Sequence, residues 1–147
     1  MLRHTRLSVY SLALTSTLWL CVLPLLLRKF SLPELLQRTT ARGNQLNLEN
    51  PSELDRTVRT LVHLCHLRFF HLSLFPRDCL RQSLVLYRGL TRMGYPAAIH
   101  FGVRKESSVL EGHSWVTVHN KPLAERAPVT SFTTVYSYPN EEWTKIS

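Results

Sequence analysis

One cysteine stands where the sequence could make it a nucleophile. Cys79 follows Asp78, a residue type that commonly caps helix N-termini, and a helical pattern of apolar residues comes after it. The first turn of a helix presents unpaired backbone N–H groups and a partial positive charge, and both favour a thiolate over a thiol. A cysteine nucleophile also needs an imidazole to pair with, so a histidine from another element is required.

Of the seven histidines, His113 is the best candidate for this base. It begins an alternating stretch, His-Ser-Trp-Val-Thr-Val, directly after Gly112, and the chain then turns near His119 and Asn120. A three- or five-residue loop centred on His119 would place Glu125 opposite His113. A two-residue turn would put their side chains on opposite faces unless a bulge restores the phase. Glu125 is therefore the expected orienting group for the imidazole, and Asn120 is the fallback.

A structural interpretation competes with the catalytic one. A cysteine at a helix start is more often structural than catalytic, His113 could cap its strand, and Glu125 could be solvated. On these residues alone the structural interpretation is favoured. Trp115 is expected in the core, with shielding of the imidazole as the alternative, and His100 is expected to face water on the sheet. No metal set or phosphate loop is visible, so no metal and no cofactor is expected.

Helices and strands must position these residues. The apolar spacing and the start and stop signals predict helices over residues 31–42, 51–70 and 78–93, and alternation predicts strands over 99–103, 114–118 and 131–138. A block of helices followed by short strands predicts an α+β fold with helices packed on one face of a small antiparallel sheet. Arg81, Arg88 and Arg92 are expected to form the solvated face of the third helix.

The N-terminal stretch from residue 7 to 27 is apolar and uncharged, and basic residues flank both of its ends. It is long enough to span a membrane, but its hydroxyl residues and Pro24 fit a helix buried against the domain equally well. A cleaved signal peptide is a weaker third alternative. Residues 1–45 are expected to form this helix and a short helical linker, and residues 46–147 the main domain.

Composition and charge disfavour some classes of function. The 147 residues are 44% apolar and 19% charged, and the net charge is +8. Four basic residues flank the apolar stretch, so residues 30–147 carry only +4, and nucleic-acid binding is not expected. The three cysteines form no CxxC pair and no disulfide framework, which favours a reducing compartment.

Several motifs together resemble those of the lasso peptide B-protein proteases, whose core is a transglutaminase-like domain. They lie between residues 50 and 126, and in order they are Cys-Leu-Arg-Gln-Ser-Leu from Cys79, Gly-Tyr-Pro-Ala from Gly94, Phe-Gly-Val-Arg-Lys from Phe101, Gly-His-Ser-Trp-Val from Gly112 and Pro-Leu-Ala-Glu from Pro122. The resemblance implies a papain-like cysteine peptidase core with Cys79 as nucleophile, His113 as base and Glu125 as acid. The acid is usually Asp in that family, so Glu125 is one methylene longer.

The same resemblance implies a function and partners. Such a protease removes the leader from a ribosomally made lasso peptide precursor, and a separate ATP-dependent cyclase closes the macrolactam ring. The chain has no room for a leader-recognition domain, which implies a separate leader-binding partner, and a cytoplasmic protein near the membrane is favoured. The alternatives are a catalytically inactive module that binds leader or cyclase, and an acyltransferase that uses the same cysteine and histidine.

Overall fold

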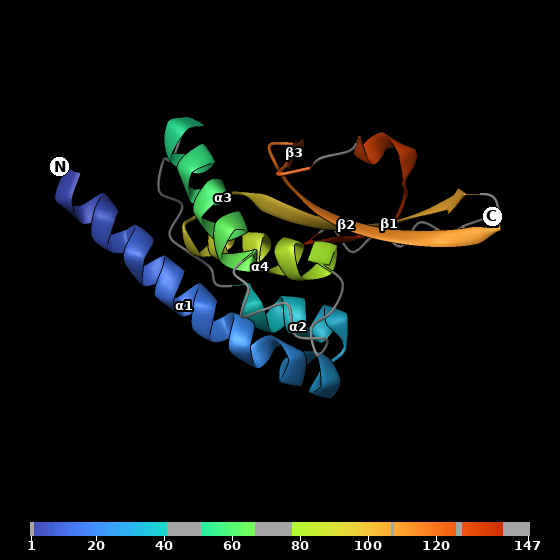
Figure 1. The fold of residues 1–147 in the computed structure, drawn as a ribbon, viewed down its shortest axis with the longest axis horizontal. Helices are drawn as coiled ribbons and strands as arrows, with labels where there is room; N and C mark the ends of the chain where they lie inside the picture. The colour runs from blue at the N-terminus through green and yellow to red at the C-terminus, as the bar shows by residue number, and fades with distance from the viewer. Residues whose placement is uncertain (1, 41–50, 67–77, 107, 126–127, 140–147) are drawn as a thin grey trace.

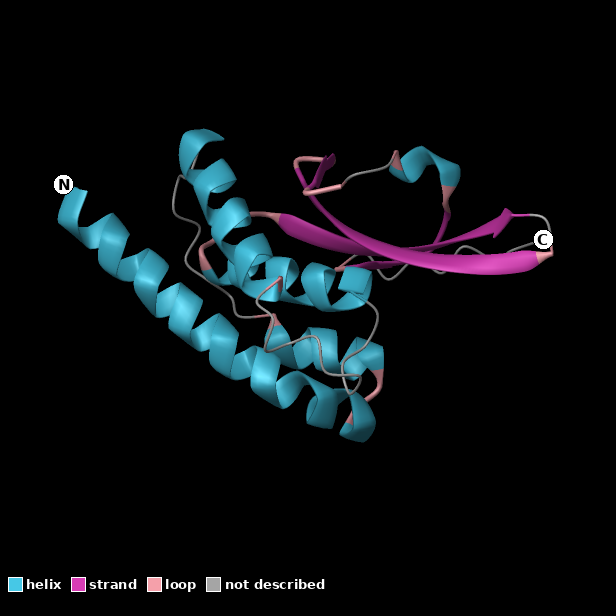
Figure 2. Ribbon diagram, in the orientation of Figure 1, coloured by secondary structure: helices cyan, strands magenta, loops and turns pink. Residues whose placement is uncertain are grey.

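Helices cover one face of a four-stranded antiparallel sheet, as Figures 1 and 2 show. The computed structural model of the chain describes residues 2–40, 51–66, 78–106, 108–125 and 128–139. In this part of the chain the helices are α1 (Leu2–Lys29), α2 (Leu32–Thr39), α3 (Pro51–Cys65) and α4 (Asp78–Arg92). The strands are β1 (Ala97–Glu106), β2 (Val109–Val118), β3 (Lys121–Leu123) and β4 (Thr133–Tyr138), in the spatial order β3-β2-β1-β4. The predicted α+β arrangement is confirmed.

The predicted elements agree with the structure except at some ends. Strand β1 extends beyond the expected residues 99–103 at both ends, and β2 begins at Val109 rather than at residue 114. Gly112 and His113 therefore lie inside β2, and the expectation that His113 begins this strand is wrong. Helix α2 begins after Ser31, whose backbone N–H donates to the Glu34 carboxylate at 2.9 Å as in a capping box, and it ends at Thr39 rather than at residue 42. The expected continuation of α3 to residue 70 lies outside the described residues, as does the expected division at residues 45 and 46. The last strand begins two residues later than expected, because a 3-10 turn, η2 (Val129–Ser131), precedes it.

Helix α4 is the central helix of the fold. It contacts α1 and α3 on one side and β1 and β2 on the other, and its buried residues include Leu84, Leu86, Tyr87 and Leu90. The chain leaves the helix through Gly94, whose positive φ of 87° suits a residue without Cβ. The helix that begins at Asp78 is thus held against the sheet along its length.

Two of the three arginines expected on a solvated face of α4 are instead packed inside. Arg81 is 1% exposed and donates to the Cys65 carbonyl at 3.0 Å, while the Arg88 guanidinium lies 5.3 Å from the centre of the Trp19 ring. Burial, with Arg92 nearby, lowers the pKa of Arg88 to about 10. Arg92 alone is exposed. The expectation failed because α1 and α3 cover this face, and a helix sequence does not show which other helices will pack on it.

Helix α1 joins the same core along one face. Leu12, Leu20 and Leu23 belong to one apolar cluster with residues of α3, α4 and the sheet. The segment Ser11–Lys29 is also long and apolar enough to cross a membrane by length and composition. The sequence favoured a membrane helix and a helix buried against the domain equally. The structure shows that one face of this helix packs against the domain.

Candidate active site

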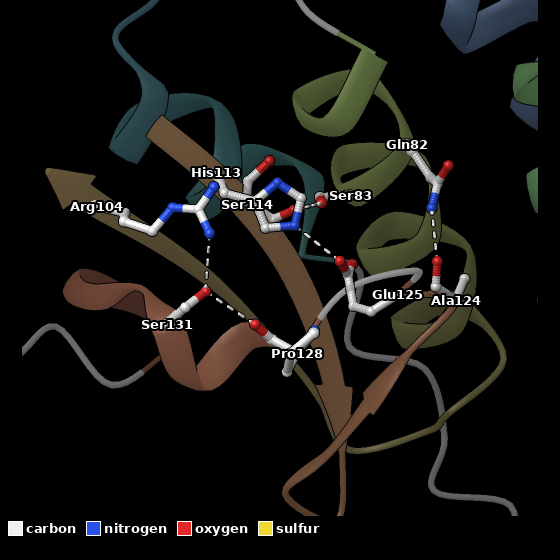
Figure 3. A network of polar contacts seen from close by, with 9 residues as sticks. All are labelled: Gln82, Ser83, Arg104, His113, Ser114, Ala124, Glu125, Pro128 and Ser131. Carbon is white, nitrogen blue, oxygen red and sulfur yellow. Dashed lines mark hydrogen bonds and ion pairs between the residues drawn. The ribbon is translucent and has the colours of Figure 1, made fainter. Parts of the chain in front are cut away.

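The structure brings His113 and Glu125 into direct contact. Nε2 of His113 lies 2.7 Å from Oε2 of Glu125, and both side chains are half-buried. Figure 3 shows the two side chains joined by this contact. An ionised carboxylate only accepts hydrogen bonds, so Nε2–H of the imidazole donates to Glu125. The lone pair of the neutral ring is then on Nδ1, which is the atom left to act as a base.

The contact depends on an irregularity in the returning strand. Val118 pairs with Lys121, so His119 and Asn120 form a two-residue turn, and both have positive φ values, 50° and 61°. The alternative of a three- or five-residue loop is therefore wrong. The regular pairing ends at Leu123, and Ala124 takes a positive φ of 57°, which turns Glu125 back toward His113. Asn120 is exposed at the turn.

The first turns of α4 contact the residue that follows His113 and the residue that precedes Glu125. Ser83 Oγ donates to the carbonyl of Ser114 at 2.8 Å, and Gln82 Nε2 donates to the carbonyl of Ala124 at 3.4 Å (Figure 3). Ser114 follows His113 and Ala124 precedes Glu125, so the N-terminal part of α4 contacts the backbone next to each of these two residues.

Cys79 lies at this end of α4, one helical turn before Ser83, and is half-buried. Within the described ranges, no hydrogen bond joins its thiol to His113. The structure thus brings His113 and Glu125 together, and Cys79 lies on the helix that contacts their chain neighbours. Its backbone N–H belongs to the first turn, where N–H groups have no partner inside the helix.

Aromatic rings fix the imidazole on the face of the sheet away from the helices. The His113 ring lies 5.0 Å from Phe132 and 6.0 Å from Trp115 between ring centres, and Trp115 in turn stacks on His100 at 5.5 Å. Trp115 is only 5% exposed, so the expectation that it is a core residue is confirmed, and its ring also stacks beside His113.

His100 was expected to face water, and this expectation is wrong. Its Nδ1 lies 2.8 Å from Ser137 Oγ and its Nε2 lies 2.9 Å from Thr117 Oγ1. Burial lowers the pKa of His100 below its ordinary 6.5. The signal that could have revealed this is the pairing of His100 with Trp115 on neighbouring strands, which depends on the β1–β2 register.

The burial of His100 predicts a loss of stability in acid. The unfolded chain binds a proton at His100 with the ordinary pKa of 6.5, while the folded chain binds it only at lower pH. Folding stability therefore falls as the pH drops below 6.5. We expect the melting temperature of the wild type to fall more than that of His100→Gln between about pH 7.5 and about pH 5.5. Equal losses in thermal scans of the two proteins would exclude His100 as the source.

Gly102 makes room for the rings beside His113. An added Cβ would lie 2.9 Å from the Trp115 ring and 3.1 Å from Phe132 Cβ. Gly102→Ala is expected to destabilise the fold by about 1–3 kcal/mol, because well-packed groups must shift. Chemical denaturation measures this, with Gly112→Ala as the matched control, since a Cβ at Gly112 would meet nothing within 4 Å. Similar stabilities for the two variants would contradict the packing described above.

Comparison with known proteins identifies the superfamily of the chain. A search of curated proteins and a search of solved structures give no match. A family model described as "Transglutaminase-like superfamily" matches residues 17–137, most of the chain, including Cys79, His113 and Glu125. The chain therefore belongs to the transglutaminase-like superfamily, which includes cysteine peptidases and acyltransferases.

Proposed function

We propose that this protein is a cysteine peptidase that removes the leader from a ribosomally made lasso peptide precursor. The catalytic part rests on the contact between His113 and Glu125. Their chain neighbours Ser114 and Ala124 accept hydrogen bonds from Ser83 and Gln82, which lie on the helix that contains Cys79. The proposed substrate rests on the motifs that resemble those of the lasso peptide B-protein proteases. The family match supports a cysteine-based acyl chemistry in general.

In the proposed mechanism Cys79 attacks the carbonyl carbon at the junction of leader and core. Its thiolate forms the new C–S bond, and the imidazolium of His113 gives its Nδ1 proton to the amine of the core peptide as the C–N bond breaks. The backbone N–H of Cys79 is placed to donate to the developing oxyanion. Water, deprotonated by Nδ1, then attacks the thioester and releases the leader as a carboxylate.

Glu125 has a positioning role in this mechanism. Its carboxylate keeps the proton of the neutral imidazole on Nε2, which leaves Nδ1 as the base, and it stabilises the imidazolium when that forms. The rings of Trp115 and Phe132 limit the rotation of the imidazole and exclude water from one side. The proposal also includes a separate leader-binding protein that delivers the precursor and a cyclase that consumes the core peptide.

Mass spectrometry of a precursor incubated with the protein and the leader-binding partner tests the function. In water enriched in heavy oxygen, we expect one cleavage and a leader that carries one heavy oxygen atom in its new carboxylate. An added amine that captures the leader as an amide instead would indicate acyl transfer, which the same residues could perform. An intact precursor with folded protein and folded partner would overturn the proposal.

A further inference from the structure

Helix α1 has two apolar faces, and only one of them is covered by the domain. The covered residues are at most 7% exposed, and they are Leu12, Ser16, Leu20 and Leu23. On the opposite side, four large apolar residues recur at helical spacing and are exposed by 64%, 60%, 45% and 64%: Leu14, Leu18, Val22 and Leu25. We call these four residues the outer stripe.

The covered face limits how the helix could meet a membrane. A spanning helix is surrounded by lipid or by other spanning helices over about 20 residues. Here one side of the helix packs on α2, α3 and α4 and shares their apolar core. The domain would have to enter the bilayer for α1 to cross it. A helix that lies flat on the surface needs to insert only its outer stripe.

The charges at the ends of α1 indicate what covers the outer stripe. Residues 1–33 contain no acidic residue, whereas Arg3 and Arg6 stand near the start of the helix and Arg28 and Lys29 in its last turn. Just beyond the helix, Lys29 and Arg38 both lie against the Phe30 ring, at 5.8 Å and 4.5 Å from its centre. An apolar stripe with basic groups at both ends complements the acyl region and anionic headgroups of a lipid surface.

The same charges disfavour a second copy of the chain as the occupant. Both ends of α1 are basic and the helix contains no acid, so parallel and antiparallel pairing would each bring basic ends together. A partner surface must supply negative charge at both ends of the stripe. An anionic bilayer does so in any orientation of the helix in its plane.

We propose that α1 binds the surface of membranes that contain anionic phospholipids, with its axis in the membrane plane and the outer stripe inserted. This binding is independent of the peptidase activity. It requires only the folded chain, because the domain holds the covered face of α1 and leaves the outer stripe to the lipid.

Co-sedimentation of the full chain with vesicles tests this proposal. We expect binding to vesicles of phosphatidylcholine with phosphatidylglycerol, roughly tenfold or more weaker binding to phosphatidylcholine alone, and loss of the difference in high salt. Leu14→Glu with Leu18→Glu should weaken binding roughly tenfold or more, since two inserted apolar side chains are replaced by anions. Arg28→Gln with Lys29→Gln should remove most of the preference for anionic lipid.

Val109→Glu with Leu110→Glu is the matched control. These two apolar residues are exposed by 65% and 66%, as much as those of the outer stripe, but they lie at the distant end of the β1–β2 hairpin (Figure 1). This variant should bind vesicles as the wild type does. Equal losses in both double variants would show general apolar adsorption and overturn the proposal.

A fluorophore on Cys21 reports the orientation of the helix. Cys21 is exposed and lies one turn before Leu25 on the same side, while Cys65 is buried, so a Cys79→Ser background directs the label to Cys21. We expect a blue shift of a polarity-sensitive dye with anionic vesicles and release of the protein by alkaline carbonate. Resistance to carbonate would indicate a spanning helix. A dimer in the absence of lipid that Leu18→Glu dissociates would indicate a second copy. Either result would overturn the proposal.

Discussion

Cys79→Ala is expected to reduce cleavage of the precursor to background, by about ten-thousand-fold or more in kcat, because it removes the thiol that forms the thioester in the proposed mechanism. The side chain is only half-buried, so its truncation should leave the fold intact. Single-turnover cleavage followed by mass spectrometry measures the loss. The wild type should also yield a covalent leader–enzyme adduct when the reaction is quenched in acid, and Cys79→Ala should not.

Cys21→Ala is the matched control for this substitution. Cys21 is a free and exposed cysteine on α1, remote in sequence from the catalytic elements, so its loss should leave cleavage unchanged. Measurable cleavage by folded Cys79→Ala would exclude Cys79 as the nucleophile. A loss in Cys21→Ala equal to that in Cys79→Ala would mean that a general thiol effect had been measured.

Glu125→Gln is expected to lower kcat by about 10²–10⁴-fold with little change in KM. The amide lacks the negative charge that stabilises the imidazolium, and its NH₂ group can bond the other tautomer of His113. Glu125→Asp keeps the charge but shortens the side chain by one methylene, so we expect it to retain more activity than Glu125→Gln. Steady-state kinetics of the two variants distinguishes the effect of the carboxylate charge from the effect of side-chain length.

Glu111→Gln is the control for the removal of a carboxylate on the same side of the molecule. Glu111 lies on β2 two residues before His113, and it bonds Arg104 at 2.6 Å rather than the imidazole. Its loss should change kcat little. Full activity of Glu125→Gln, or equal losses in Glu111→Gln and Glu125→Gln, would contradict the positioning role assigned to Glu125.

The two ends of α4 could be predicted from the sequence because their causes are local. Asp78 and the apolar residues after it begin α4, and Gly94 and Pro96 follow its end. The α+β class likewise follows from the change of apolar period after Pro96. Cys79 and His113 could be singled out for the same reason, since a helix N-terminus and an alternating apolar pattern are local features.

The contacts of the site could be only partly predicted, because register and packing depend on residues far apart in the chain. Glu125 contacts His113 because Ala124 adopts a left-handed conformation after a two-residue turn. The sequence was compatible with this turn and with longer loops. The environment of His100 depends on which residue of β2 lies opposite it, and here that residue is Trp115.

The helices, the alternating strands after Pro96, the capping of α2 and the residues able to do cysteine chemistry follow from the amino-acid sequence, because these features depend on neighbours within a few positions. Three other features depend on the folded molecule: Glu125 bonds His113, α3 and α1 pack on Arg81 and Arg88, and α1 keeps one apolar face uncovered. The physical reason is that burial and pairing are set by whichever distant surface packs on a residue, and a residue type constrains that surface only weakly.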